Sequence, residues 1–396
     1  MKEDGLPPQN SMAEIYLDNS ATTRVYPEVA SLIEKIMEED YGNAASLHRK
    51  GMEAERYVKH AKEQIALTLR VDPKNIFFTS GGTESNNWAI TGAALANRRA
   101  GMKIVTTAIE HPSVRNVVRF LEDFGFSAVY LPVDQDGVVR LEDLKEAVTP
   151  DTILVSVMFV NNEIGSVQPV GEIGAWLKKN RPDTLFHVDA IQAYGKYEIR
   201  PKKLGIDLMS VSGHKLHGPK GVGFLYVADH VKIKPLLYGG GQQKGMRSGT
   251  ENVPGEAGMG LAAEIMYKNL PANVSSMYAR KQRLTEGLER IEGAHVNGKK
   301  GQESAPHIVS CSFDGVWSEV LLHALEAKHI YVSSGSACAS SHPSEITTLL
   351  AIGLKKEEQE GTIRFSLSEW TTDEEIDETL SALKELLPQL RKFTRK

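Results

Sequence analysis

Apolar runs alternate with helical patterns along residues 54–230, and this alternation constrains the fold more than any other feature of the chain. Apolar residues recur at helical spacing over 54–69, over 84–97 and beyond His111-Pro112. The runs that indicate strands cover residues 76–78, 103–107, 128–133, 153–160, 185–188, 208–211 and 222–227. Several of them are apolar throughout, as strands covered on both faces are. The pattern therefore predicts an α/β fold with a mostly parallel, seven-stranded sheet flanked by helices.

The pattern changes after about residue 255. Helical stretches are indicated at 258–268, 274–291, 318–327 and from about 372, with strands at 308–313 and 362–367. We interpret this part as a smaller α+β domain against which the N-terminal segment packs. The expected division is a large domain at 21–260 and a small domain made of 13–20 and 261–396, with residues 1–12 as a disordered extension or a remnant of expression.

Composition narrows the classes of function. The 396 residues carry a formal net charge of −5, which gives no basic signature for nucleic acid or anionic membrane. No apolar run is long enough to span a bilayer, and residues 1–9 have no signal-peptide core. The chain has 2 cysteines, which argues against a disulfide framework and for a reducing compartment, so we expect a cytoplasmic protein.

A lysine directly follows one of the predicted strands. Lys215 ends the sequence Ser212-Gly213-His214-Lys215, which comes immediately after the apolar run 208–211. Burying an ammonium group is costly unless the group is neutralised or used covalently, and a lysine in such a place can form a Schiff base with an aldehyde cofactor. The alternative is a solvent-exposed lysine in a glycine-rich turn.

Polar residues recur where the predicted strands end, at the edge of the sheet where α/β proteins bind ligands. They are Thr83, His111, Asn162, Asp189, Gln192 and Ser212 to Lys215. The helix start after Gly81-Gly82 offers free N–H groups to a phosphate, Asp189 offers a carboxylate, and Lys215 offers an amine. Pyridoxal phosphate needs these three groups from a protein, so the sequence predicts a site for that cofactor.

Each residue also has an ordinary explanation when it is taken alone. Thr83 is a common N-cap type, and Asp189 could tie a loop. His111 could stack on the cofactor ring and move protons, or simply begin a helix. Arg364, in the strand 362–367, could clamp a substrate carboxylate or pair with a nearby acidic side chain. A metal site is disfavoured because cysteines are scarce and His187, His214 and His217 lack tight ligand spacing.

The two cysteines lie in contrasting surroundings. Cys338 is in the Ser/Gly-rich stretch 333–341, where a thiol is accessible, and this raises the odds of nucleophilic use. Cys311 is in the alternating strand 308–313, which is typical of a buried core residue.

A series of motifs resembles those of the cysteine desulfurases, class V aminotransferase-like enzymes of the fold-type I pyridoxal phosphate group. The motifs are Tyr16–Thr23, Thr79–Asn87, Val160–Gly165, His187–Ala190, Ser212–Lys215, Arg247–Thr250, Ser333–Cys338 and Ile363–Ser366. They follow the family's order from about Ile15 to about Leu387, which makes the match specific. Gly82 stands where the family usually has alanine, and we expect this change only to loosen the turn.

The resemblance implies which residues hold the cofactor. Lys215 would carry it as a Schiff base, and Asp189 would pair with its pyridine nitrogen. Its phosphate would be held by Thr83, Ser212 and His214, beside Gly82. Its ring oxygen would lie near Gln192 and Asn162, and His111 would stack on the face of its ring. Thr250 would reach the phosphate of the partner subunit, so the family's homodimer is implied.

The resemblance also implies the reaction, which converts L-cysteine to L-alanine. Arg364 would bind the substrate carboxylate with Asn162 nearby, and His111 would serve in acid–base steps. Cys338 would attack the substrate sulfur and keep it as a persulfide for an acceptor or iron–sulfur scaffold protein, in iron–sulfur cluster or thiolated-nucleoside biosynthesis. The spacing from Cys338 to Ile352-Gly353 resembles the long-loop subgroup, although the composition of the loop 333–345 differs.

Other functions fit the same fold. A selenocysteine lyase or an aminotransferase is the nearest alternative, because fold alone does not fix chemistry. An aminotransferase would not need a cysteine in its Ser/Gly loop. A non-catalytic binding subunit is the alternative from a different class of protein. Such a subunit would form no yellow Schiff base and would remain colourless when pyridoxal phosphate is added.

Overall fold

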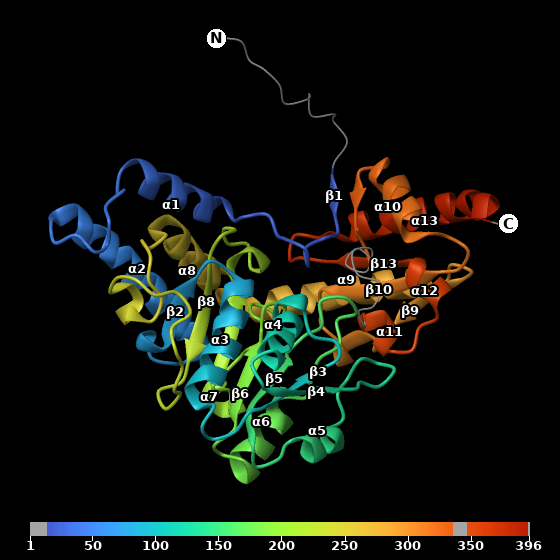
Figure 1. The fold of residues 1–396 in the computed structure, drawn as a ribbon. Coiled ribbons are helices and arrows are strands. Elements are labelled where there is room, and N and C mark those ends of the chain that lie inside the picture. The colour runs from blue at the N-terminus through green and yellow to red at the C-terminus, as the bar shows by residue number, and fades with distance from the viewer. Residues whose placement is uncertain (1–13, 336–346, 395–396) are drawn as a thin grey trace.

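The computed structural model describes residues 14–335 and 347–394, and a seven-stranded sheet forms its centre (Figure 1). In spatial order the strands are β2 (Ile76–Thr79), β8 (Gly223–Val227), β7 (Leu208–Ser212), β6 (Leu185–Asp189), β5 (Thr152–Met158), β3 (Lys103–Thr107) and β4 (Ser127–Leu131). Within this sheet β8 runs antiparallel to both neighbours, and the other pairs are parallel. The predicted mostly parallel, seven-stranded sheet is confirmed.

Helices cover both faces of this sheet, which explains why several of its strands are mostly apolar. In β5 every residue is buried, with Leu154 on one face and Val155 and Val157 on the other. The first face packs against α3 (Gly82–Asn97) and α4 (Pro112–Glu122). The helices that share a core with the second face are α2 (Arg49–Leu69), α5 (Leu141–Ala147), α6 (Val170–Asn180) and α8 (Val253–Lys268). The result is a three-layer arrangement.

Helix α8 begins earlier than the sequence pattern indicated. The predicted start was residue 258, whereas α8 starts at Val253. The side chain of Asn252 accepts a hydrogen bond of 3.1 Å from the Gly255 N–H, and Pro254 lies in the first turn. An Asn cap followed by proline is a standard helix start, so capping rather than apolar spacing sets this boundary.

A second sheet forms a separate core with its own helices (Figure 1). Its four strands are antiparallel and are ordered β12 (Ser333–Ser334), β13 (Thr362–Ser366), β10 (Ile308–Phe313) and β9 (Ala294–Asn297). The helices of this core are α9 (Leu270–Glu289), α10 (Ser318–Glu326) and α13 (Asp373–Thr394). The other helices of the described chain are α1 (Pro27–Glu38), α7 (Pro201–Leu204), α11 (Thr348–Ala351), α12 (Lys356–Glu360), η1 (Pro73–Asn75), η2 (Gly213–Lys215), η3 (Gln242–Gly245) and η4 (Gly301–Glu303).

The N-terminal segment connects the two sheets. Strand β1 (Ile15–Tyr16) pairs in parallel with β11 (Ile330–Tyr331). A few residues later, Asn19 Nδ2 donates a 2.9 Å hydrogen bond to the carbonyl of Ser366, and Thr23 Oγ1 donates one of 3.0 Å to the carbonyl of His214. Residues 18–23, here called the crossing segment, therefore run from the small sheet to the end of β7. The domain limits stay a prediction.

Among residues 14–335 and 347–394, no helix combines the length and the apolar character that crossing a bilayer requires.

Candidate active site

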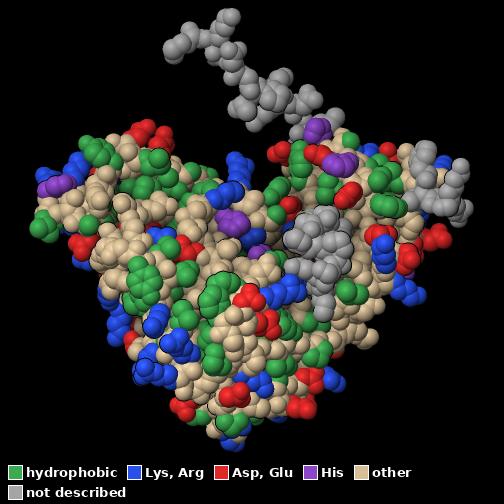
Figure 2. All heavy atoms as spheres, viewed as in Figure 1, with side chains coloured by type: hydrophobic (Ala, Val, Ile, Leu, Met, Phe, Trp, Pro, Cys, Tyr) green, Lys and Arg blue, Asp and Glu red, His purple; other side chains and the backbone are tan. Residues whose placement is uncertain are grey.

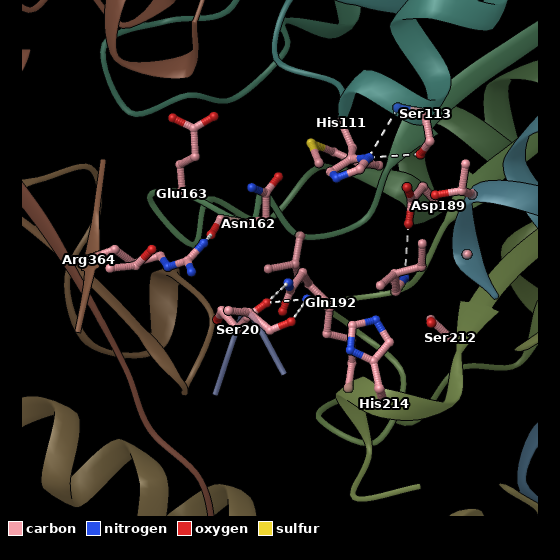
Figure 3. A pocket seen from close by; sticks show the side chains of 18 of the residues that line it. Ser20, His111, Ser113, Asn162, Glu163, Asp189, Gln192, Ser212, His214 and Arg364 are labelled. Carbon is pink, nitrogen blue, oxygen red and sulfur yellow. Dashed lines mark hydrogen bonds between the residues drawn. The ribbon is translucent and has the colours of Figure 1, made fainter. Parts of the chain in front are cut away.

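A cavity of about 400 Å³ lies where β2, β3, β5, β6 and β7 end (Figure 3). Figure 2 shows this face of the molecule hollowed between its two halves, with basic and histidine side chains in the hollow. The predicted site residues that line the cavity are Gly82, Thr83, His111, Asn162, Asp189, Gln192, Ser212, His214, Lys215 and Arg364. Thr250 lies outside the lining, and Cys338 lies outside the described residues.

The helix start beside the cavity is built on two glycines. Gly81 has a φ of +151°, a conformation that residues with side chains rarely adopt. A Cβ on Gly82 would stand 2.2 Å from the Cδ1 atom of Ile191, so an alanine here would force Ile191 to shift. Ile191 therefore packs into the space that the missing side chain leaves, and the expected loosening of this turn stays a prediction. The free N–H groups of α3 meet the cavity beside Thr83 and Ser212.

Asp189 presents a buried carboxylate at the end of β6 (Figure 3). Its Oδ2 accepts a 2.8 Å hydrogen bond from Asn86 Nδ2, and its Oδ1 accepts one of 3.0 Å from the Ile191 N–H. Burial raises the pKa of Asp189, whereas these hydrogen bonds and the nearby His111 and Lys215 oppose the rise. A protonated ring nitrogen facing this carboxylate would supply the counter-charge that burial demands.

Lys215 extends into the cavity from the short η2 turn that follows β7. Its Nζ donates hydrogen bonds to the carbonyls of Ser20 and Ala21, the latter at 2.6 Å. Burial, reinforced by the positive charge of Arg364, lowers the pKa of Lys215 to about 8. Roughly a tenth of this amine is therefore uncharged at pH 7, far more than in an exposed lysine, and the uncharged amine is the state that attacks an aldehyde.

His111 is the N-cap residue of α4 and faces the cavity. Its Nδ1 accepts a 3.1 Å hydrogen bond from the Ser113 N–H and lies 2.8 Å from Ser113 Oγ. Burial lowers the pKa of His111, so the ring is neutral at pH 7. Because Nδ1 acts as an acceptor, the proton of the neutral ring is on Nε2.

Arg364 pairs with an acidic side chain, as one of the two interpretations predicted, and its role toward a substrate carboxylate stays a prediction. It lines the cavity from β13, and its Nη2 also forms a 2.9 Å ion pair with Asp18 Oδ1. Its Nη1 donates a 2.8 Å hydrogen bond to the carbonyl of Asn162. Ser333 pairs directly opposite Arg364, and Ser333, Ser334 and Gly335 line the same cavity.

Comparisons with known proteins place this geometry in a family. The family model described as Aminotransferase class-V matches residues 15–379. The chain is 43% identical over 383 residues to a protein of Clostridium botulinum named "Cysteine desulfurase IscS", with 96% of both chains covered. It is also 43% identical over 380 residues to a protein of the same name from Methanosarcina thermophila, covering 96% of this chain and 93% of the relative. The chain belongs to the class-V aminotransferase family.

A solved structure supports the same assignment. The structure titled "NIFS-LIKE PROTEIN" superposes with a TM-score of 0.90 at 40% sequence identity, covering 96% of this chain and 100% of the other. The resemblance to the cysteine desulfurases within this class-V family is confirmed, and so is the fold predicted from it.

The cysteine desulfurases of the class-V aminotransferase family depend on pyridoxal phosphate, and the cavity of this chain fits that cofactor. The cavity offers Asp189 for the ring nitrogen, the Lys215 amine for the aldehyde, and the start of α3 with Thr83 and Ser212 for the phosphate. His214 beside them has a pKa lowered to about 4 by burial and by Lys215, so it meets a phosphate as a neutral ring. When it is bound to an amino acid, pyridoxal phosphate withdraws electrons from the α carbon.

Thr250 lies on an exposed loop rather than in the cavity. This loop is fastened to α3 by Arg247, whose Nε and Nη2 donate hydrogen bonds of 2.8 and 2.9 Å to the two oxygens of Glu84. Gln243, earlier in the loop, accepts a 2.7 Å hydrogen bond from Lys62 of α2. That Thr250 contacts the cofactor phosphate bound by the partner subunit stays a prediction.

His187, which the sequence raised as a possible metal ligand, lies inside the large sheet. Its Nδ1 is 2.8 Å from Ser156 Oγ and its Nε2 is 2.9 Å from Ser210 Oγ. Burial lowers its pKa to about 3, so the ring is neutral and both of its nitrogens have partners. No group of three or more metal-ligating side chains occurs among residues 14–335 and 347–394.

The sequence reasoning attached no role to several residues that line the cavity or contact its lining. Asn86, Asp18 and Ser20 belong to motifs that carry the family resemblance, but no role was attached to them. His307 belongs to no motif, yet its Nε2 lies 3.2 Å from Oε1 of Gln192. Gln192 Nε2 in turn donates a 3.0 Å hydrogen bond to the carbonyl of Ser20, so these contacts fix which way the amide of Gln192 points.

Proposed function

We propose that this chain is a pyridoxal phosphate-dependent cysteine desulfurase that converts L-cysteine to L-alanine and keeps the released sulfur as a persulfide on Cys338. The observation that carries the proposal is the position of Lys215. Its amine, with a pKa lowered to about 8, faces the same cavity as the buried carboxylate of Asp189. The names of the relatives, "Cysteine desulfurase IscS", supply the substrate.

Different residues of the cavity would bind the substrate and transfer its protons. Arg364 would hold the carboxylate of L-cysteine, with Asn162 beside it. Lys215 Nζ, once released from the cofactor, would take the α proton because its lowered pKa leaves it partly uncharged. The Nε2 proton of His111 faces the same space and would serve in later proton transfers.

The sulfur step needs a thiolate, which Cys338 would provide. The thiolate sulfur attacks the sulfur of the bound L-cysteine, so a sulfur–sulfur bond forms as the carbon–sulfur bond breaks. The electrons of the broken bond stay with carbon, which takes a proton and becomes the methyl group of alanine. Cys338 follows Gly335, a residue that lines the cavity, by three positions in the sequence.

The test compares two cysteine variants in the holoenzyme. Cys338→Ser should abolish alanine formation from L-cysteine, and mass spectrometry of the unsubstituted protein after incubation with L-cysteine should find one extra sulfur atom on Cys338. Cys311→Ser, at a buried core position, serves as the matched control and should keep the activity. Unchanged turnover of L-cysteine by Cys338→Ser would overturn the persulfide mechanism.

The same test separates the related activities. A selenocysteine lyase would keep lysis of its own substrate in Cys338→Ser. An aminotransferase would release no sulfur in either form of the protein. Lys215→Ala should be colourless after treatment with pyridoxal phosphate, and borohydride should fix the cofactor to Lys215 in the unsubstituted protein.

We further propose that the enzyme works in the cytoplasm as a homodimer and hands its sulfur to an acceptor protein. Exposed apolar side chains of α1, α2 and the segment between them support a partner surface, namely Met37, Tyr41, Leu47 and Met52. Figure 2 shows hydrophobic side chains gathered over this region. Sedimentation of the holoenzyme should give twice the chain mass, and a monomer would contradict the dimer.

The acceptor is proposed to be an iron–sulfur scaffold protein or a protein of thiolated-nucleoside synthesis. The long spacing between Cys338 and Gly353 in the sequence supports this choice, because a long loop can present sulfur beyond the cavity. Loading Cys338 with ³⁵S from L-cysteine and adding a cysteine-containing scaffold protein should move the label to the scaffold. A label that stays on Cys338 until a small thiol is added would contradict transfer to a protein.

A further inference from the structure

We propose that Asp18 is a positioning residue that orients Arg364 toward the carboxylate of the substrate. The proposal rests on the proposed role of Arg364 as the carboxylate clamp. Asp18 Oδ1 lies 2.9 Å from Nη2 of Arg364, and the two residues are 346 positions apart in the chain. The pair therefore forms only when the crossing segment reaches the small sheet.

The contacts of Arg364 leave it ready for a second anion. A guanidinium carries five N–H groups, two on each terminal nitrogen and one on Nε. Asp18 takes one N–H from Nη2, and the Asn162 carbonyl takes one from Nη1. Its Nε is buried and has no hydrogen-bond partner among the described residues, so the N–H on Nε and one N–H on each terminal nitrogen remain for a carboxylate. Asp18 thus fixes the plane of the guanidinium without occupying both terminal nitrogens.

The charge balance of the cavity gives a second reason for Asp18. Lys215 and Arg364 both face the cavity, and the side chain of Arg364 is only 11% exposed. A cation this deeply buried is costly unless an opposite charge or an acceptor stands beside it. Asp18, whose side chain is 21% exposed, supplies that charge at hydrogen-bond distance, and it also acts on Lys215 as a neighbouring negative charge.

The backbone of Asp18 is held independently of its side chain. Residue 18 forms a parallel bridge with Ser366, and its carbonyl accepts a 3.0 Å hydrogen bond from the Ala21 N–H. Asn19 adds a 2.9 Å side-chain hydrogen bond to the Ser366 carbonyl. Shortening the Asp18 side chain should therefore leave the crossing segment in place and release only Arg364.

The experiment measures L-cysteine turnover by holoenzyme carrying Asp18→Ala or Asp18→Asn. Asp18→Ala should raise KM for L-cysteine roughly tenfold, as expected for losing one charge-assisted hydrogen bond, with kcat little changed. Asp18→Asn keeps an oxygen that accepts from Nη2 and should restore KM to near its original value. Cysteamine, which is L-cysteine without the carboxylate, should bind all three proteins equally when followed by cofactor absorbance.

Arg364→Ala separates this inference from the function on which it rests. If Arg364→Ala leaves KM for L-cysteine unchanged, the carboxylate clamp itself is wrong. If Arg364→Ala raises KM and Asp18→Ala does not, the clamp stands and the positioning role is overturned. Equal losses for L-cysteine and cysteamine in Asp18→Ala would show general damage to the site and would also overturn it. In the double variant, Asp18→Ala should add nothing to Arg364→Ala.

Discussion

The side-chain amide of Asn86 donates a 2.8 Å hydrogen bond to Oδ2 of Asp189. The same amide nitrogen donates a 2.9 Å hydrogen bond to Ser113 Oγ, which lies 2.8 Å from Nδ1 of His111. One asparagine on α3 therefore connects the carboxylate assigned to the pyridine nitrogen with the imidazole assigned to the face of the same ring.

Replacing Asn86 should weaken retention of the cofactor. In Asn86→Ala, Asp189 Oδ2 loses its side-chain donor, so the pKa of Asp189, already raised by burial, should rise further. The Kd of the apoenzyme for pyridoxal phosphate should increase roughly tenfold, the scale of one lost hydrogen bond to a charged group. Fluorescence quenching on cofactor binding measures this. Asn97→Ala, at the far end of α3, is the control, and equal Kd values for the two variants would contradict the role of Asn86.

The pH dependence of cofactor capture should report the pKa of Lys215. Since burial lowers this pKa to about 8 from the ordinary value of 10.5, the reactive amine forms about 2.5 pH units lower than in an exposed lysine. The rate at which apoenzyme reacts with pyridoxal phosphate should rise up to about pH 8 and then level off. Stopped-flow absorbance at a series of pH values measures this, with Lys215→Arg as the unreactive control. A rate that still climbs steadily through pH 10 would contradict it.

Lys281 should make stability depend on pH. Its Nζ is buried against Ser304 Oγ and the Ala305 carbonyl, and burial lowers its pKa to about 7. Between about pH 7 and 10.5 the unfolded chain binds more protons at this site than the folded one, so this group's penalty is full below that window and fades as pH rises. The slope reaches at most about 1.4 kcal/mol per pH unit.

Lys281→Met removes that titration. Urea unfolding at pH 7, 8 and 9 should show the stability of the unsubstituted protein rising toward that of the variant as pH increases. Lys268→Met, at an exposed position at the end of α8, should leave the original pH slope in place. Parallel curves for Lys281→Met and the unsubstituted protein would contradict the assignment.

The two cysteines should differ in reactivity. Cys311 is fully buried in β10, and burial raises the pKa of its thiol to about 12, so it should resist iodoacetamide in the folded protein. Cys338 should be alkylated first. Peptide mass spectrometry before and after urea unfolding reads both sites, and alkylation of Cys311 at the rate of Cys338 in the folded state would contradict the prediction.

The parts of the fold that were predictable are those with a local pattern. The seven strands of the large sheet are short apolar runs bounded by loops, and the rule that ligands gather at strand ends brought Asp189 and Lys215 into one site. Helix α1 was missed although Val29, Ile33 and Ile36 follow helical spacing after Pro27, so its signal was present. The strands β1, β11 and β12 have two residues each, which is too short for any periodicity.

Contacts between distant parts of the chain left no local signal. The pair Asp18–Arg364 joins residues 346 positions apart, and His307 meets Gln192 across 115 positions. Tertiary packing alone decides such pairs. From the sequence, the partner of Arg364 could be predicted only as either a substrate carboxylate or an acidic side chain that was not identified.

The crossing segment has a consequence for biosynthesis. Lys215 Nζ is held by carbonyls of Ser20 and Ala21, while Asn19 and Asp18 are fastened to Ser366 and Arg364. A ribosome must therefore pass residue 366 before residues 18–21 can make these contacts and the lysine acquires its final surroundings. A nascent polypeptide that stops short of strand β13 therefore has no complete pocket to offer to vitamin B6.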